Sequence, residues 1–111
     1  MSQQQSVMEQ CLQQCATVVQ TAGQCADSCL SGGQADAMQQ CIRLCLDAAT
    51  LTGACAEMMA RNSAFSGQVC GLCADVCDTC ATECERHGGD IMRECAEACR
   101  ACAQTCRQMA A

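Results

Sequence analysis

The segment CGLCADVCDTCATEC, residues 70–84, places five cysteines in fifteen residues. The gaps between them alternate between two and three residues, so a cysteine recurs every three or four positions. This spacing is typical of an α-helix in a bundle, where the a and d positions of each heptad face the partner helices. The segment therefore predicts a helix with one face lined by thiols, and not a loop that wraps a metal ion.

The other cysteines follow the same spacing in three further segments. They are Cys11, Cys15, Cys25 and Cys29 in the first, Cys41, Cys45 and Cys55 in the second, and Cys95, Cys99, Cys102 and Cys106 in the last. With Cys70, Cys73, Cys77, Cys80 and Cys84 they make up all sixteen cysteines of the chain. Because every cysteine falls on such a face, we predict that four helices turn their thiols into one shared interior.

The rest of the composition also favours helices. The chain has no proline and is rich in Ala, Gln, Glu and Met, and it lacks the alternating β-branched and aromatic residues of strands. Helix-ending residues at 31–33, 62–63 and 88–90 divide the chain, and Ser63 and Asp90 are candidate caps of the helices that follow. We predict helices over 6–30, 35–61, 64–87 and 90–109. Such short connections predict an all-α, antiparallel up-down-up-down four-helix bundle, formed as a single domain over 1–111.

Charge and hydropathy exclude several classes of partner. The formal net charge is −6, and the six basic residues form no stripe, so nucleic acid is not an expected partner. The N-terminal residues lack the basic and apolar regions of a signal peptide, and no segment has the length and hydrophobicity of a membrane span. We therefore expect a cytoplasmic protein, in which thiols stay reduced and bind metal or undergo redox chemistry more often than they form disulfides.

Several roles for the thiols compete. Free cysteine can fill a core as a small hydrophobic residue, although Ala, Val or Leu would do so without inviting oxidation. Disulfides between helices are geometrically possible. A peroxide-reactive thiol needs positive charge nearby, and no Lys or Arg lies on the cysteine faces. An enzyme is not expected, because the chain has one histidine and no carboxylate on those faces. Metal binding is the leading hypothesis.

Among metals, Cu(I) fits this pattern best. Zn²⁺ and iron–sulfur clusters use four thiolates, usually held by turns, whereas these cysteines lie on helices and the spacing does not organise them in fours. Cu(I) is soft and is satisfied by two or three thiolates. Each Cu⁺ replaces one thiol proton, whereas Zn²⁺ with four thiolates leaves about two negative charges in an apolar interior. With thiolates shared between ions, the loading approaches about one Cu(I) per cysteine.

The cysteine pairs on every helix, ending in CATEC, ECAEAC and CAQTCR, resemble those of the bacterial copper-storage proteins of the cytosolic branch. The resemblance covers nearly the whole chain. It implies a four-helix bundle, commonly a homotetramer, that stores many Cu(I) ions on the sixteen cysteine thiolates and buffers copper. The alternative function is metallothionein-like sequestration of Zn²⁺ or Cd²⁺. Val18, Ala22, Ala48 and Thr52 replace cysteine in the middle of the first two helices and lower the expected capacity.

The ends and one surface of the bundle carry further expectations. Up-down topology should gather Cys29, Met38, His87 and Met92 at one end, where Met38, His87 and Met92 are candidate auxiliary ligands for copper entry. The other end should gather Met8, Met59, Phe65 and Met109, which we expect to plug the core. A second apolar stripe on the first two helices predicts self-association of the chain. It consists of Leu12, Ala16, Val19, Gly23, Ala26 and Leu30, followed by Ile42, Leu46, Ala49, Gly53, Ala56 and Ala60.

Overall fold

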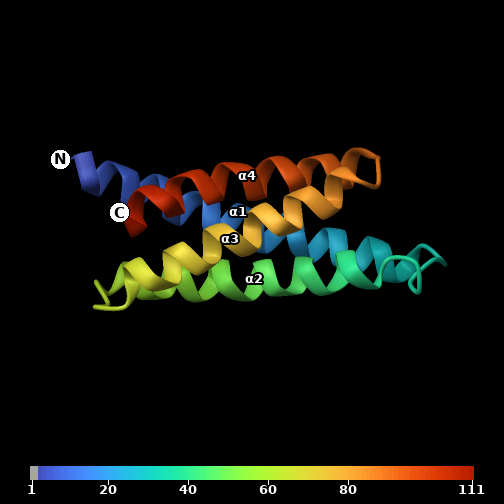
Figure 1. The fold of residues 1–111 in the computed structure, drawn as a ribbon, viewed down its shortest axis with the longest axis horizontal. Coiled ribbons are helices and arrows are strands. Elements are labelled where there is room, and N and C mark those ends of the chain that lie inside the picture. The colour runs from blue at the N-terminus through green and yellow to red at the C-terminus, as the bar shows by residue number, and fades with distance from the viewer. Residues whose placement is uncertain (1–2) are drawn as a thin grey trace.

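A computed structural model describes residues 3–111 of the chain, so the first two residues of the predicted domain lie outside the described part. Four helices make up the structure: α1 (Gln3–Ser31), α2 (Gln39–Ala60), α3 (Ser66–Glu85) and α4 (Asp90–Ala110). They lie side by side along the long axis of a molecule that measures 47 × 21 × 18 Å (Figure 1). The predicted all-α four-helix bundle is confirmed.

The helices alternate in direction, and each packs on two neighbours. Helix α1 packs against α2 and α4, and α3 packs against the same two helices. The α1–α2 and α3–α4 connections therefore lie at one end of the bundle, which we call the His87 end. The α2–α3 connection and the C-terminus lie at the other end, which we call the Met59 end (Figure 1).

The boundaries of α2 and α3 differ from the prediction because short turns replace the expected α-helical residues. Met38 N–H donates to Ala35 O, an i to i+3 bond, and α2 begins only at Gln39, not at residue 35. Similar bonds from Ser66 N–H to Ser63 O and from His87 N–H to Cys84 O precede α3 and follow it. Helix ends often tighten in this way, and the side chains alone do not distinguish the two kinds of turn.

The turns use the glycines and the asparagine that the sequence singled out. Asn62 and Gly33 have φ values of 54° and 81°, and Gly88 and Gly89 have values of 90° and 103°. The predicted caps are wrong in detail. Ser63 Oγ accepts a hydrogen bond from Phe65 N–H within the turn, and Asp90 is the first residue of α4, with the uncapped Gly89 before it.

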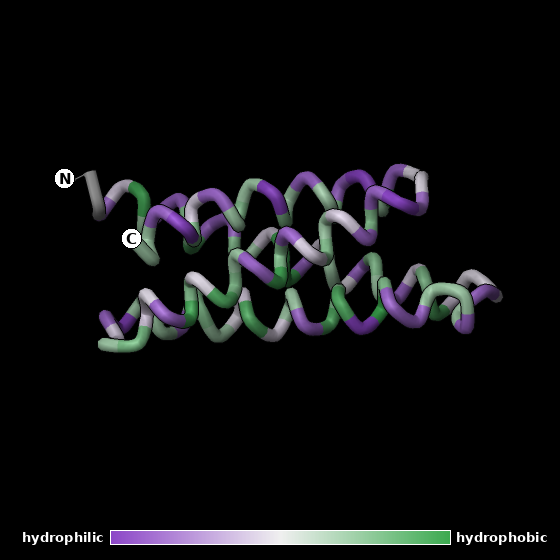
Figure 2. The backbone as a smooth tube through the Cα atoms, viewed as in Figure 1, coloured by the Kyte–Doolittle hydropathy of each residue, from purple (hydrophilic) through white to green (hydrophobic). Residues whose placement is uncertain are grey.

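Small residues let the helices approach one another closely. Alanines beside the cysteine faces are almost fully buried between α3 and α4: Ala74, Ala81, Ala96 and Ala103. Ion pairs bridge the same two helices on the outside, with Arg100 and Arg107 both bound to Asp78. Figure 2 shows that α4 carries many hydrophilic positions, whereas α2 is more hydrophobic along its length. The interior that results is narrow and is filled mainly by sulfur.

Candidate metal centre

All sixteen cysteines lie in the interior as free thiols. The most exposed of them, Cys29, has 5% of its surface accessible to solvent, and most of the others have none. They are buried because each occupies an a or d position of its helix. The structure thus brings together every cysteine that the sequence predicted as a metal ligand.

The thiols meet across helix pairs in a fixed antiparallel register. The Sγ–Sγ distances between α1 and α4 are 3.6 Å for Cys11–Cys106 and 3.7 Å for Cys15–Cys102. Those between α2 and α3 are 4.0 Å for Cys41–Cys84, 3.8 Å for Cys45–Cys80 and 3.1 Å for Cys55–Cys70. Such pairs offer a two-coordinate ion its ligands with little movement.

The paired thiols also form larger groups, in which all sulfurs lie within 4.8 Å of one another. Groups of three include Cys11, Cys15 and Cys106; Cys55, Cys73 and Cys106; Cys73, Cys77 and Cys102; and Cys25, Cys29 and Cys41. One group of four takes a cysteine from each helix: Cys25, Cys45, Cys84 and Cys95. The expectation that the cysteines are not organised in fours is therefore wrong at this point, because packing across helices, which sequence spacing does not show, brings these four together.

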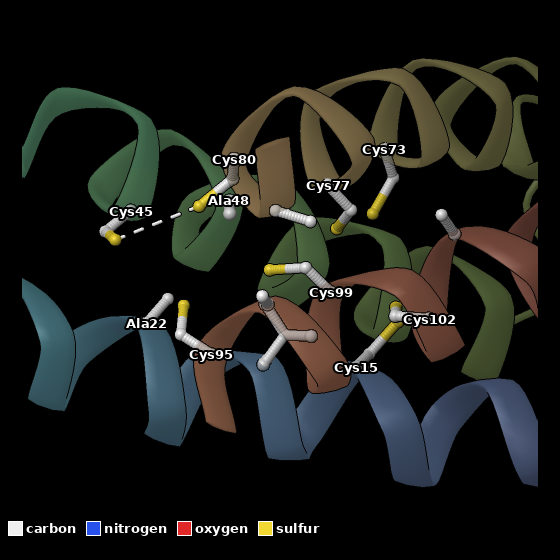
Figure 3. Close-up of a cluster of buried hydrophobic side chains, with 14 of the residues drawn as sticks. Cys15, Ala22, Cys45, Ala48, Cys73, Cys77, Cys80, Cys95, Cys99 and Cys102 are labelled. Atoms are coloured by element: carbon white, nitrogen blue, oxygen red, sulfur yellow. Dashed lines mark hydrogen bonds between the residues drawn. The ribbon is translucent and has the colours of Figure 1, made fainter. Parts of the chain in front are cut away.

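The middle of the bundle has sulfur on only two of its four sides. Val18 and Ala22 of α1 and Ala48 and Thr52 of α2 are all fully buried there. The Thr52 hydroxyl donates to Ala48 O at 2.7 Å, so it is bound to its own helix. Figure 3 shows the thiols of α3 and α4 continuing through this region, opposite the side chains of Ala22 and Ala48.

Burial keeps protons on the thiols at the rim of the interior. It raises the pKa of Cys29 to about 12 and also raises the pKa values of Cys41 and Cys70. Deeper thiols share protons through hydrogen bonds, and the bond with Cys106 lowers the pKa of Cys11. A buried thiolate without a cation is costly, so binding a soft cation and losing a proton are coupled in this interior.

At the His87 end, Met92 lies against the first thiols. Its Sδ accepts hydrogen bonds from the thiols of Cys25 and Cys41, with Sγ–Sδ distances of 3.4 Å and 3.8 Å. A hollow of about 390 Å³ beside the α3–α4 turn has Cys84 and Met92 in its wall, together with Gly88, Gly89, Ala96 and the charged side chains of Glu85, Arg93 and Glu97. From the surface, this hollow therefore reaches the Cys84 thiol and Met92.

His87 and Met38 lie at the same end but are arranged differently from Met92. His87 Nε2 lies 2.9 Å from Glu83 Oε2, so this ring nitrogen is bound to a carboxylate. The hydrogen bond from His87, with the nearby charge of Arg86, lowers the pKa of Glu83. Met38 is partly buried and packs on the core. Of the three predicted auxiliary ligands, Met92 is the one whose sulfur accepts hydrogen bonds from two buried thiols.

At the Met59 end, a hollow of about 560 Å³ is lined by Met8, Met59 and Met109 together with the polar residues Gln5, Asn62, Ser63 and Ser66. Met59 is fully buried, as expected for a core plug. Phe65 has 62% of its surface exposed, so its predicted part in the plug is wrong. Phe65 lies in the turn that precedes α3, at a position that the sequence had predicted to be part of the helix.

Two buried polar residues were not predicted. Glu83 lies beside the cysteine face of α3, and Thr105 beside that of α4, where its hydroxyl donates to Gln14 Oε1 of α1. Glu83 and His87 are four residues apart on one helix, a spacing at which side chains meet. The spacing of Glu83 and His87 could have revealed their contact, whereas no local sequence signal predicts the hydrogen bond between Thr105 and Gln14.

Comparison with known proteins places this arrangement in a family. The family model described as copper storage protein matches residues 3–111. Among curated protein sequences, none matches the chain. No helix in the described part of the chain has the length and apolar character needed to cross a membrane.

Solved structures show the same architecture. Apo copper storage protein 3 from Bacillus subtilis is 36% identical, with 93% of this chain and 98% of that chain covered and a TM-score of 0.85. The Cu(I)-bound protein BsCsp3 is 35% identical, covering 95% and 99% of the two chains, with a TM-score of 0.90. A cytosolic copper storage protein from Streptomyces lividans, loaded with five coppers, is 34% identical, covering 96% and 94%, with a TM-score of 0.92. The shared sequence, fold and length show that this chain belongs to the copper storage protein family.

Proposed function

We propose that this protein stores many Cu(I) ions on the thiolates of its sixteen cysteines, within one bundle domain, and so buffers copper in the cytoplasm. The observation that carries the proposal is the set of buried sulfur groups, whose members lie within 4.8 Å of one another along the interior. Two of its relatives support it, since one is a Cu(I)-bound copper storage protein and the other is a cytosolic copper storage protein loaded with five coppers. The role is that of a store and not of an enzyme.

The chemistry of the interior favours Cu(I) over divalent ions. Most groups contain three thiols, which suits the low coordination numbers of Cu(I). Each Cu⁺ that replaces a proton leaves the net charge of the interior unchanged, whereas a divalent ion with four thiolates adds about two negative charges. Along an interior this narrow and apolar, the difference accumulates with each ion bound.

Sequestration of Zn²⁺ or Cd²⁺ is the second candidate, and one observation favours it locally. Cys25, Cys45, Cys84 and Cys95 form a four-thiol group, the donor set of structural zinc sites. Anaerobic competition separates the two functions. We expect Cu(I) to displace bound Zn²⁺ completely, and Zn²⁺ in large excess to leave bound Cu(I) in place. Retention of several Zn²⁺ ions per chain against Cu(I) would instead support the second candidate.

We further propose that copper enters at the His87 end, with His87, Met38 and Met92 as auxiliary ligands. The hollow beside Gly89 and the contacts of Met92 with Cys25 and Cys41 support this route. Replacing His87 by Ala and Met92 by Leu together should slow copper uptake without reducing the final capacity. The matched control replaces Met8 and Met109 by Leu at the Met59 end. Equal uptake rates in the two variants would contradict the proposed route.

We propose that the chain self-associates through α1 and α2. The expected assembly is a homotetramer, as the resemblance to the bacterial copper-storage proteins implies. Val19 and Leu46 of the apolar stripe remain 42% and 51% exposed, and a Cβ added at Gly23 or Gly53 would meet no atom within 4 Å. Light scattering should give a multiple of the 11.6 kDa chain mass. Replacing Val19 and Leu46 by Asp should reduce it to one chain, whereas replacing the equally exposed Leu72 on α3 should not. A wild-type mass of one chain would exclude this interface.

A further inference from the structure

The sulfur groups collect into two clusters, one toward each end of the bundle. The His87-end cluster consists of Cys25, Cys29, Cys41, Cys45, Cys80, Cys84 and Cys95. The Met59-end cluster consists of Cys11, Cys15, Cys55, Cys70, Cys73, Cys77, Cys102 and Cys106. Groups within each cluster share members: Cys25 joins those of the first, and Cys73 and Cys106 join those of the second.

Cys99 takes part in none of the Sγ–Sγ pairs and groups described above, and it lies between the two clusters. Its thiol lies near enough to Cys77 on one side and to Cys80 on the other to affect the pKa values of both. Figure 3 shows its sulfur pointing into the middle of the interior, between Cys80 and Cys95 in one direction and Cys77 and Cys102 in the other. The side chain has no accessible surface, so any ion that it holds is inside the bundle.

The other two helices offer no soft ligand at this level. The register that pairs Cys11 with Cys106 and Cys15 with Cys102 places Val18 opposite Cys99. In the same way, the pairs between α2 and α3 place Ala48 opposite Cys77. Two apolar side chains therefore stand where the outer parts of the bundle have thiols.

A copper ion cannot cross this level without a ligand. A bare monovalent cation in a medium of low dielectric constant is strongly destabilised, so Cu(I) has to bind the next thiolate before it leaves the last one. In the transfer, a Cu–S bond to Cys99 forms as a bond to Cys80 breaks. The Cys99 proton passes to the thiolate left behind, and copper remains Cu(I). The oxidation state and the number of protons are unchanged.

We propose that Cys99 is the transfer residue that carries Cu(I) between the two clusters, so that without it one half of the store fills slowly. The proposal rests on the storage function proposed above but does not depend on which end copper enters. The competing route is a direct step along α3 from Cys80 to Cys77, one helical turn apart. The experiment below separates the two routes.

The test follows copper uptake by the reduced protein under nitrogen, after mixing with excess Cu(I) supplied as a weak complex. Bound copper per chain is counted after rapid desalting at a series of times. In Cys99→Ala we expect two phases, with about half of the ions bound at the wild-type rate and the rest at least about tenfold more slowly. The matched control, Cys70→Ala, also removes one thiol, so its plateau should fall by about one ion, but the remaining ions should bind in a single phase.

A rescue variant addresses the register directly. Combining Val18→Cys with Cys99→Ala returns a thiol to the same level from α1, and we expect it to restore fast filling of both halves. Circular dichroism confirms the fold of each variant. If the alanine variant does not fold, Cys99→Ser takes its place in the same uptake experiment. Serine has nearly the volume of cysteine but is a poor ligand for Cu(I). Single-phase filling of a folded Cys99 variant at the wild-type rate would overturn the proposal.

The same experiment distinguishes failure of this proposal from failure of the proposed entry route or of the proposed storage function. If copper enters at the Met59 end, Cys99→Ala still fills in two phases, but adding Cys70→Ala then reduces the fast phase. If copper enters at the His87 end, adding Cys84→Ala reduces the fast phase instead. If the chain does not store copper, the wild-type protein itself binds only one or two ions.

Discussion

At the scale of single residues, the choice between sulfur and a non-ligating side chain determines what each level of the interior can hold. Thr52 illustrates this choice, since it lies on the cysteine face of α2, is fully buried, and uses its hydroxyl to bind Ala48 O of its own helix. The register between α2 and α3 places it opposite Cys73. A thiol at this position would complete a pair that the natural chain lacks.

Replacing Thr52 by Cys should therefore raise the capacity by about one Cu(I) ion, since thiolates shared between ions give about one ion per cysteine. The two side chains are similar in size, so the core should accept the change. Anaerobic titration with Cu(I) measures the plateau. Thr52→Val, which also removes the hydroxyl but adds no sulfur, is the control. An unchanged plateau in Thr52→Cys would show that sulfur at this level is not used.

Glu83 is the one buried carboxylate among the described residues that bonds to a histidine, and it makes the stability of the apo protein depend on pH. Its pKa is lowered by the hydrogen bond from His87. A carboxyl group with a lowered folded-state pKa stabilises the fold above its unfolded-state pKa, and this contribution is lost as pH falls through the folded-state pKa. The melting-temperature advantage of wild type over Glu83→Gln should therefore shrink from about pH 7 to about pH 3. A constant difference across that range would contradict this role.

At the scale of helices, alanine sets how closely α3 and α4 approach. Ala81 is fully buried beside the cysteine face. Replacing it by Leu should lower the free energy of unfolding by about 1–3 kcal/mol, because the added volume cannot be accommodated without moving a helix. Urea unfolding of the apo protein measures the change. Gln104→Leu on the exposed face of α4 should change stability by less than about 0.5 kcal/mol, and an equal loss in both variants would contradict the packing argument.

The helices themselves could be predicted from the sequence because cysteine marks their buried faces so regularly. Spacing alone placed Cys70, Cys73 and Cys77 on one face of α3, and the same held for the other three helices. The helix ends could not be predicted to the residue, since Met38 and His87 lie in i to i+3 turns whose backbone bonds leave no mark in the sequence. The exposed position of Phe65 follows from such a turn.

The candidate site could be predicted as a list of residues but not as groups. Which thiols meet depends on the axial register between helices, and only the folded chain shows that Cys25 joins Cys45, Cys84 and Cys95. The interaction of Cys99 with thiols on both sides depends on the same register. The positions without sulfur, such as Val18 and Ala48, were visible in the sequence, but their effect on the continuity of the thiols was not.

At the scale of the whole molecule, the bundle is a container whose interior exchanges protons for copper. Burial raises the pKa values of Cys29 and Cys41, so these thiols hold protons near neutral pH. Loading should then release roughly one proton per Cu(I) bound and weaken as pH falls, because protons compete with copper for sulfur. An indicator dye in weakly buffered solution measures the release. Copper binding without release of protons would show that the thiols are already ionised.

The central claim is that the interior stores copper on many thiolates, and an anaerobic titration of the reduced protein with Cu(I) tests it most directly. Ions bound per chain are counted at the plateau against a chelator of known affinity. The account predicts a plateau well above ten, approaching about one ion per cysteine. A plateau at one or two ions per chain would contradict storage, whatever the affinity of those ions.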